Sequence, residues 1–286
     1  MKFLRLAIWL VIASGGTKAL SADAVWYHPS WAYRKAISIN ATNVAGPLTN
    51  FPVLISLNDS DLQLRALASG NDLVFTSRDG TTKLAHEIES YAKGSLTAWV
   101  KIPSLTSTSN TILYLYYGNA AAANQQSPAG VWDENYNTVW HLKEASSGAT
   151  REFKDSTTNG RHARGRGGIP AVTTGKFGVG QVFNGTSDYI EGESNVNITG
   201  NSARTLSFWV KLSSASGSAI AGWGNANNNE SFIAGAYANY WTLAGNGGGN
   251  DWTSIATAST DSWQFHTIVH NGSTAKWYVN GTEIGT

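Results

Sequence analysis

The fold is decided by the stretch Thr205-Leu206-Ser207-Phe208-Trp209-Val210-Lys211. Every second residue of this stretch is apolar and faces one way, which is the period of a β-strand. Residues 265–269 alternate in the same manner. Asn280-Gly281 follows a further strand-like run at 275–279, and this dipeptide is a strong signal for a two-residue hairpin. The pattern predicts an all-β domain in the second half of the chain.

The first half of the chain also reads as β-structure. Runs rich in β-branched and aromatic residues are expected to form strands. These runs are residues 37–39, 51–57, 72–76, 99–102 and 111–117. One short helix is expected at 60–67, where leucines alternate with polar residues. Only 14% of the residues are charged, and 30 glycines are present, as many short strands with tight turns require.

The first 24 residues have the features of an export signal. Lys2 and Arg5 precede an apolar run at 6–13 that is too short to span a bilayer. Ala22-Asp23-Ala24 is a plausible cleavage site, with cleavage after Ser21 or Ala22 as alternatives. We therefore expect a signal peptide at 1–24 and a protein exported to the periplasm, the cell surface or the medium.

Charge and cysteine content limit the chemistry. Removal of residues 1–24 changes the formal net charge from +1 to −1. A nearly neutral chain argues against nucleic acid and anionic membranes as partners. The sequence contains no cysteine, so it has no disulfide framework, thiolate zinc site or thiol nucleophile. The absence of disulfides in an exported chain favours a bacterial envelope or secreted protein.

Five motifs in the first half resemble a known family. They are Trp31-x-Tyr33-Arg34-Lys35, Phe51-Pro52-Val53, His86-Glu87-Ile88-Glu89-Ser90-Tyr91, Trp99-Val100-Lys101-Ile102-Pro103 and Tyr116-Tyr117-Gly118-Asn119. In this order they resemble an uncharacterised bacterial domain family of unknown function. We expect a β-sandwich domain at 25–120. The resemblance implies an exported or surface protein, with a possible association with a proton-channel-energised envelope transport system.

A connector precedes a second domain. Residues 120–130 are small, polar and aperiodic, and we place a linker at 121–137. Further motifs follow in order. They are Trp140-His141-Leu142-x-Glu144, Phe153-x-Asp155-Ser156-Thr157-Thr158-Asn159-Gly160, Phe183-Asn184-Gly185-Thr186-Ser187-Asp188-Tyr189, Thr205–Lys211, Trp263–Val269 and Lys276-Trp277-Tyr278-Val279-Asn280-Gly281.

This second series resembles the laminin-G-like jelly roll of the concanavalin A-like lectin/glucanase superfamily. The resemblance covers 138–286, which we expect to be a jelly-roll sandwich. Members of the superfamily continue with several more strands after the hairpin at Asn280-Gly281. The sequence is therefore expected to be a fragment that lacks the last strands of its jelly roll.

Glu87 and Glu89 allow two interpretations. Residues i and i+2 of a strand share a face, which would place the two carboxylates about 6–7 Å apart, a distance that suits an acid/base pair. The favoured interpretation is structural. In it both glutamates face solvent, Ile88 faces the core, and His86 and Ser90 are its neighbours on the inner side.

The resemblance also implies a calcium site. In many laminin-G-like jelly rolls a Ca²⁺ ion joins the N-terminal loop to the C-terminal strand, and Asp155 and Asn159 match the oxygen donors of that loop. Two side chains do not fill a shell of six to eight oxygens. The alternative is that both residues only stabilise a tight turn of the Asx type.

Aromatic and amide residues are dense beyond residue 220. Sugars are bound by flat aromatic faces and by amides that read hydroxyl groups. Our candidates for glycan contacts are Trp223, Tyr237, Tyr240, Trp241 and Trp252. The alternative is that these aromatic residues pack in the core of the sandwich.

The function predicted from the sequence is binding without catalysis, with a glycan or another surface protein as the partner. The first alternative is a structural or adhesive spacer in a larger surface protein. A weaker alternative is a glycoside hydrolase, which needs two carboxylates flanking a cleft. Asp188-Tyr189-Ile190-Glu191-Gly192-Glu193 does not have the order of acidic residues that the glucanases of the superfamily carry.

Overall fold

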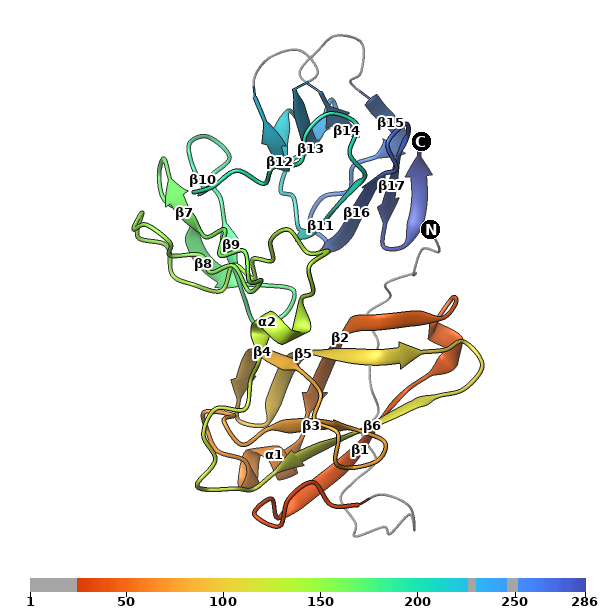
Figure 1. Ribbon diagram of the computed structural model, residues 1–286. Helices are drawn as coiled ribbons and strands as arrows, with labels where there is room; N and C mark the ends of the chain where they lie inside the picture. The colour runs from red at the N-terminus through yellow and green to blue at the C-terminus, as the bar shows by residue number, and fades with distance from the viewer. Residues whose placement is uncertain (1–24, 226–229, 246–251) are drawn as a thin grey trace. The chain divides into compact units, whose positions relative to one another are not determined.

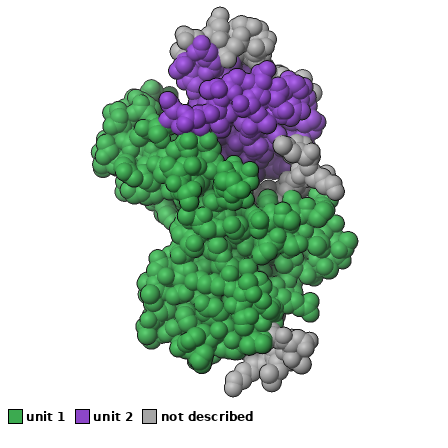
Figure 2. Space-filling view, viewed as in Figure 1, with its two compact units in different colours: residues 1–4, 8–194 green, residues 5–7, 195–286 purple. Residues whose placement is uncertain are grey.

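The structure, a computed structural model, describes residues 25–225, 230–245 and 252–286, so the predicted signal peptide lies outside it. The described residues form two compact units, 25–194 and 195–286 (Figure 2). Strands dominate both units, which confirms the predicted all-β sandwich class. Among the described residues no helix is long and apolar enough to cross a membrane.

The first unit contains a sandwich of two three-stranded antiparallel sheets (Figure 1). The first sheet, in the order β1-β6-β3, consists of β1 (Tyr33–Ile39), β6 (Thr111–Tyr117) and β3 (Val74–Ser77). The second, in the order β2-β5-β4, consists of β2 (Leu48–Asn58), β5 (Ser95–Leu105) and β4 (His86–Ala92). A 3₁₀ turn covers Ala41–Asn43, and α1 (Ser60–Arg65) confirms the short predicted helix.

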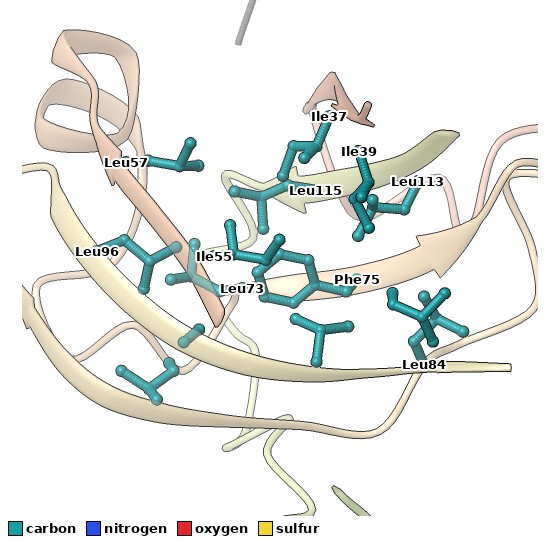
Figure 3. Packing of buried hydrophobic residues seen from close by; sticks show 14 of the residues in the cluster. Ile37, Ile39, Ile55, Leu57, Leu73, Phe75, Leu84, Leu96, Leu113 and Leu115 are labelled. Atoms are coloured by element: carbon teal, nitrogen blue, oxygen red, sulfur yellow. The ribbon is translucent and has the colours of Figure 1, made fainter. Parts of the chain in front are cut away.

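Alternating apolar residues fill the space between these two sheets (Figure 3). Ile37 of β1 and Leu115 of β6 point toward Ile55 of β2 and Leu96 of β5, and Phe75 lies among them. All five side chains have no exposed surface. Because successive residues of a strand point to opposite faces, the same alternation leaves the other face of each sheet to be covered by other parts of the chain.

The rest of the first unit is built from small elements that follow the sandwich. They are α2 (Pro128–Val131), a two-stranded sheet of β7 (Ala163–Arg166) with β10 (Tyr189–Gly192), and a hairpin of β8 (Ala171–Thr174) with β9 (Val179–Val182). We expected residues 138–194 to belong to the jelly roll. The structure instead places them in the first compact unit. Within this segment, His141 and Ser156 bond to Glu87 of β4.

The second unit is a sandwich of two four-stranded antiparallel sheets. One sheet consists of β11 (Arg204–Val210), β16 (Gln264–His270), β17 (Ala275–Val279) and β18 (Thr282–Gly285). The other consists of β12 (Ser218–Gly224), β13 (Ser231–Tyr237), β14 (Tyr240–Ala244) and β15 (Trp252–Thr257). Asn280 and Gly281 join β17 to β18 with φ angles of 50° and 80°, which confirms the predicted two-residue hairpin.

Candidate functional site

Two exposed tyrosines flank the turn between β13 and β14. Tyr237 pairs with Tyr240 across a two-residue turn, and Ala238 and Asn239 of the turn have φ angles of 48° and 70°. Positive φ at both turn residues is the geometry of a type I′ hairpin. The neighbouring pair, Ala236 with Trp241, is buried, so the two tyrosines point to the opposite, outer face of the sheet. Tyr237 is 66% exposed and Tyr240 is 41% exposed.

The outer face beside these tyrosines carries small side chains. Next to the tyrosines, Gly235 of β13 pairs with Thr242 of β14 and with Ala219 of β12. Farther along the same face, Gly222 of β12 pairs with Ile233 of β13. A Cβ atom added at Gly222 would lie 2.4 Å from the carbonyl oxygen of Phe232, so a larger residue does not fit there without a backbone shift. The residues next to the tyrosines on this face are therefore small, Gly235, Ala219 and Thr242, and Ile233 follows them on β13. Exposed rings beside small side chains form a platform on which a flat ligand can stack.

The other aromatic candidates lie elsewhere. Trp241 is 1% exposed and packs on the ring of His266, 4.3 Å between ring centres, so its prediction as a stacking residue was wrong. Trp223 is half-buried against Phe232, and its Nε1–H donates to the carbonyl of Ile198 at 3.3 Å. Trp252 begins β15, but its side chain lies outside the part that the structure describes. The candidate platform is therefore reduced to Tyr237 and Tyr240.

Asp155 is the centre of a tight loop. Its Oδ1 accepts hydrogen bonds from the backbone N–H groups of Val139 and Thr157, both at 3.0 Å. Its Oδ2 accepts from the Thr157 hydroxyl and the Arg161 N–H, both at 2.8 Å. Asn159 donates its Nδ2–H groups to the carbonyls of residues 136 and 137. Asp155 is 8% exposed, so these bonds replace its contacts with water.

This geometry does not fit a Ca²⁺ ion. The carboxylate of Asp155 is already surrounded by four donors of the chain, and Asn159 directs its amide nitrogen toward the loop. A calcium shell needs six to eight oxygens. Within residues 25–225, 230–245 and 252–286, no group of three or more His, Cys, Asp or Glu side chains could hold a metal ion. The observed contacts are those of the turn that was the alternative interpretation.

A buried polar cluster lies on the outer face of β4. The imidazole of His141 sits between two carboxylates, with Nε2 3.1 Å from Glu87 Oε2 and Nδ1 3.4 Å from Glu89 Oε2. Glu87 also accepts hydrogen bonds from Trp132 Nε1–H at 2.8 Å and the Ser156 hydroxyl at 2.7 Å. Glu87 is 5% exposed, so the expectation that both glutamates face solvent was wrong.

The charges of this cluster stabilise one another. Burial alone would lower the pKa of His141, but its hydrogen bonds and its attraction to Glu87 and Glu89 outweigh burial and raise the pKa to about 9. Burial alone would raise the pKa of Glu87, and the bonds from His141, Trp132 and Ser156 lower it instead. The cluster therefore holds an imidazolium between carboxylates, and it joins the 131–157 segment to β4.

We expect His141 to titrate far above an ordinary histidine. Its folded pKa of about 9 exceeds the ordinary 6.5, so its stabilising contribution is complete below pH 6.5 and is lost as the pH rises through about 9. The imidazole C2–H resonance, followed by NMR against pH and assigned with the variant His141→Gln, checks this. Titration of that resonance near pH 6.5 would contradict the ion cluster.

Comparisons with known proteins assign both parts of the chain. The described residues form two units, each with an antiparallel β-sandwich. Residues 69–153 match the Domain of unknown function (DUF2341), and residues 184–286 match the Concanavalin A-like lectin/glucanases superfamily. The chain thus carries a DUF2341 domain followed by a concanavalin A-like domain. The first match includes the predicted linker at 121–137. Trp132 of that segment is also bonded to Glu87 of β4.

Two solved structures show a weaker likeness. One is domain 4 of AbnA, a GH43 extracellular arabinanase from Geobacillus stearothermophilus, in complex with arabinotriose. It is 20% identical, covers 46% of this chain and 67% of its own, and has a TM-score of 0.37. The other is an S-layer domain-containing protein from Clostridium thermocellum, 23% identical over 52% of this chain and 70% of its own, with a TM-score of 0.34. These scores are too low to carry a functional argument. No curated protein matches the chain.

Proposed function

We propose that this is an exported bacterial surface or envelope protein that binds glycans through its second unit without catalysis. The observation that carries the proposal is the pair Tyr237 and Tyr240, exposed side by side on the outer face of β13 and β14. Aromatic rings that retain this much exposed surface present flat apolar faces to solvent, and such faces stack on the C–H groups of a sugar. The match to a lectin and glucanase superfamily supports the same class of ligand.

The surroundings of the platform favour binding over hydrolysis. A glycoside hydrolase places two carboxylates about 5–9.5 Å apart on either side of the scissile bond. None of the four strands β12, β13, β14 and β15 contains Asp or Glu. In the first unit, Glu87 and Glu89 are covered side chains bonded to His141. Glu191 and Glu193 are both paired with Arg164. The predicted association with an envelope transport system stays a prediction.

Loss of the tyrosine rings is expected to weaken glycan binding. Each of the variants Tyr237→Ala and Tyr240→Ala should reduce affinity by roughly tenfold, since a lost stacking contact of about 1.4 kcal/mol corresponds to that factor. The double variant should lose more. The measurement is isothermal titration of the full chain with soluble polysaccharides that the wild type binds in a glycan array.

Tyr189→Ala is the matched control, because Tyr189 is 52% exposed but lies on β10 of the first unit. It should bind as the wild type does. Equal binding by the double variant and the wild type would refute the platform, and no binding to any glycan would favour the structural spacer. Release of reducing ends from a bound polysaccharide would show that the protein is a hydrolase.

A further inference from the structure

The two sheets of the second unit differ in charge. The strands β11, β16, β17 and β18 carry ionisable side chains, among them Arg204, Lys276 and Glu283. The strands β12, β13, β14 and β15 contain no Asp, Glu, Lys, Arg or His at all. Charged residues normally make up a quarter or more of an exposed protein surface. A sheet without any, whose outer face holds two exposed tyrosines, is therefore a specialised surface.

The hydrogen-bonding groups around the tyrosines are also neutral. Thr257 of β15 pairs with Tyr240 and is exposed. The backbone N–H of Asn239 donates to the carbonyl of Ala215 at 3.1 Å, which brings the loop with the exposed residues Ser214 and Ser216 beside the turn. The exposed polar side chains next to the tyrosines in the described part are thus hydroxyls and one amide.

Two charged residues of opposite sign flank this loop. Lys211 precedes the loop, and its ammonium lies 5.8 Å from the centre of the Trp263 ring. Asp261 donates its backbone N–H to the carbonyl of Leu212 at 2.7 Å and has the opposite charge. An anionic sugar is bound by Arg or Lys in charge-assisted hydrogen bonds, and its desolvation on an uncharged sheet is not compensated.

We propose that the platform selects neutral glycans and discriminates against carboxylated or sulfated ones. This inference rests on the proposed function, because it names the class of ligand that the same site takes. Stacking on Tyr237 and Tyr240 supplies the apolar contact, and the hydroxyl and amide groups of Thr257 and Asn239 are able to pair with uncharged sugar hydroxyls. The strands β12, β13, β14 and β15 themselves contain no Lys or Arg that could pair with a carboxylate or sulfate.

The test compares each neutral polysaccharide with its own charged derivative. Dextran, mixed-linkage β-glucan and arabinan are titrated into the full chain, each beside its carboxymethylated form of equal length. For any pair that binds, carboxymethylation is expected to weaken the binding by about tenfold or more. Affinity for the neutral form is expected to change by less than about twofold between 50 and 500 mM NaCl, since no ion pair is screened.

A gain-of-function variant provides the converse test. Thr242→Lys places a cation on the outer face beside Tyr240, and it should raise affinity for the carboxymethylated polymer by roughly tenfold in a salt-dependent way. Circular dichroism checks that this variant is folded, and Tyr189→Lys is its control in the first unit. If the Thr242→Lys variant is folded but its preference for the neutral over the carboxymethylated polymer is unchanged, the inference is contradicted.

Two failures are distinguishable. Tyrosine-dependent binding that is stronger for the charged derivatives, or that falls steeply with salt in the wild type, would overturn this inference and leave glycan binding intact. Wild-type chain that binds no polymer of the panel, or binding that the double variant Tyr237→Ala/Tyr240→Ala retains, would overturn the proposed function and this inference with it.

Discussion

The variant Glu87→Ala is expected to destabilise the first unit by about 3–5 kcal/mol, the range found when one partner of a buried ion pair is removed. The carboxylate of Glu87 accepts three hydrogen bonds, from Trp132 Nε1–H, His141 Nε2–H and the Ser156 hydroxyl, at 2.8, 3.1 and 2.7 Å. Its removal leaves three buried donors without that acceptor, and the imidazolium keeps only Glu89 as a counter-ion.

Hydrogen exchange measured by mass spectrometry checks this prediction, because it reports the free energy of opening for each segment separately. Peptides from β4 and from 131–157 should exchange much faster in Glu87→Ala, while peptides from the second unit should not change. Glu87→Gln should give an intermediate result, since it keeps the shape and one acceptor but loses the charge.

Glu191→Ala is the matched control. Glu191 also belongs to the first unit and also forms ion pairs, with Arg164 and Arg166. Those pairs are exposed to solvent, where screening and the freedom of the side chains leave little net stabilisation. If Glu87→Ala exchanged no faster than Glu191→Ala, the buried cluster would not be what holds residues 131–157 on β4.

The strands and their inward faces were predictable from the sequence. The alternation in 205–211 and 265–269 reappears in β11 and β16, and Asn280-Gly281 turns the chain where the dipeptide predicted. The boundary between the two units, which we placed at 138, could not be predicted in the same way. Periodicity states which residues share a face, but it does not state which later segment covers that face.

The error on Glu87 has this same origin. The alternation placed Ile88 in the core, and the glutamates were correctly assigned to the other face of β4. The segment that covers that face begins more than 40 residues later, at Trp132. The sequence contained both partners, in the motifs His86–Tyr91 and Trp140–Glu144. Because these motifs are far apart in the chain, the sequence did not indicate that His141 binds between Glu87 and Glu89.

The sequence did not reveal which aromatic candidates face the core, because the turn between β13 and β14 has no recognisable sequence signal. Trp241 and Tyr240 are adjacent in the sequence and therefore point to opposite faces of β14. Which of them faces the core depends on where the hairpin turns, and Ala238-Asn239 lacks the glycine that usually marks a type I′ turn. Because the position of the turn was not known, the sequence could not distinguish the exposed Tyr237 and Tyr240 from the buried Trp241.

Acid is expected to destabilise the second unit by about 3 kcal/mol between pH 6.5 and pH 4 through His266. This imidazole has no exposed surface, and its ring stacks on Phe208 with 5.1 Å between centres. Its Nδ1 accepts a hydrogen bond from Trp277 Nε1–H at 3.0 Å, so the proton of the neutral ring is on Nε2. In the described part of the chain Nε2 has no hydrogen-bond partner.

A second proton has no favourable place in this environment. It would put an N–H on Nδ1 against the N–H of Trp277, and burial lowers the pKa of His266 to about 4. The folded pKa therefore lies below the ordinary 6.5, and the unfolded chain binds a proton that the folded chain does not bind. The stability is complete above about pH 6.5 and is lost as the pH falls toward 4.

The variant His266→Phe separates titration from packing. Phenylalanine keeps a ring against Phe208 but leaves Trp277 Nε1–H without its acceptor, so the variant should be less stable at pH 7 by about 1–3 kcal/mol. Its stability should nevertheless depend much less on pH, because the titrating group is gone. Hydrogen exchange of β16 and β17 peptides between pH 4 and 7 measures both quantities in the second unit alone.

His270→Gln is the control for this comparison, since His270 ends the same strand in a half-exposed position. It should keep the acid sensitivity of the wild type. His86 of the first unit is also fully buried, with burial lowering its pKa to about 4, so the first unit should retain its own loss of stability in acid when His266 is replaced. Acid sensitivity of β16 and β17 that persists in His266→Phe would assign the effect to another group and contradict the role of His266.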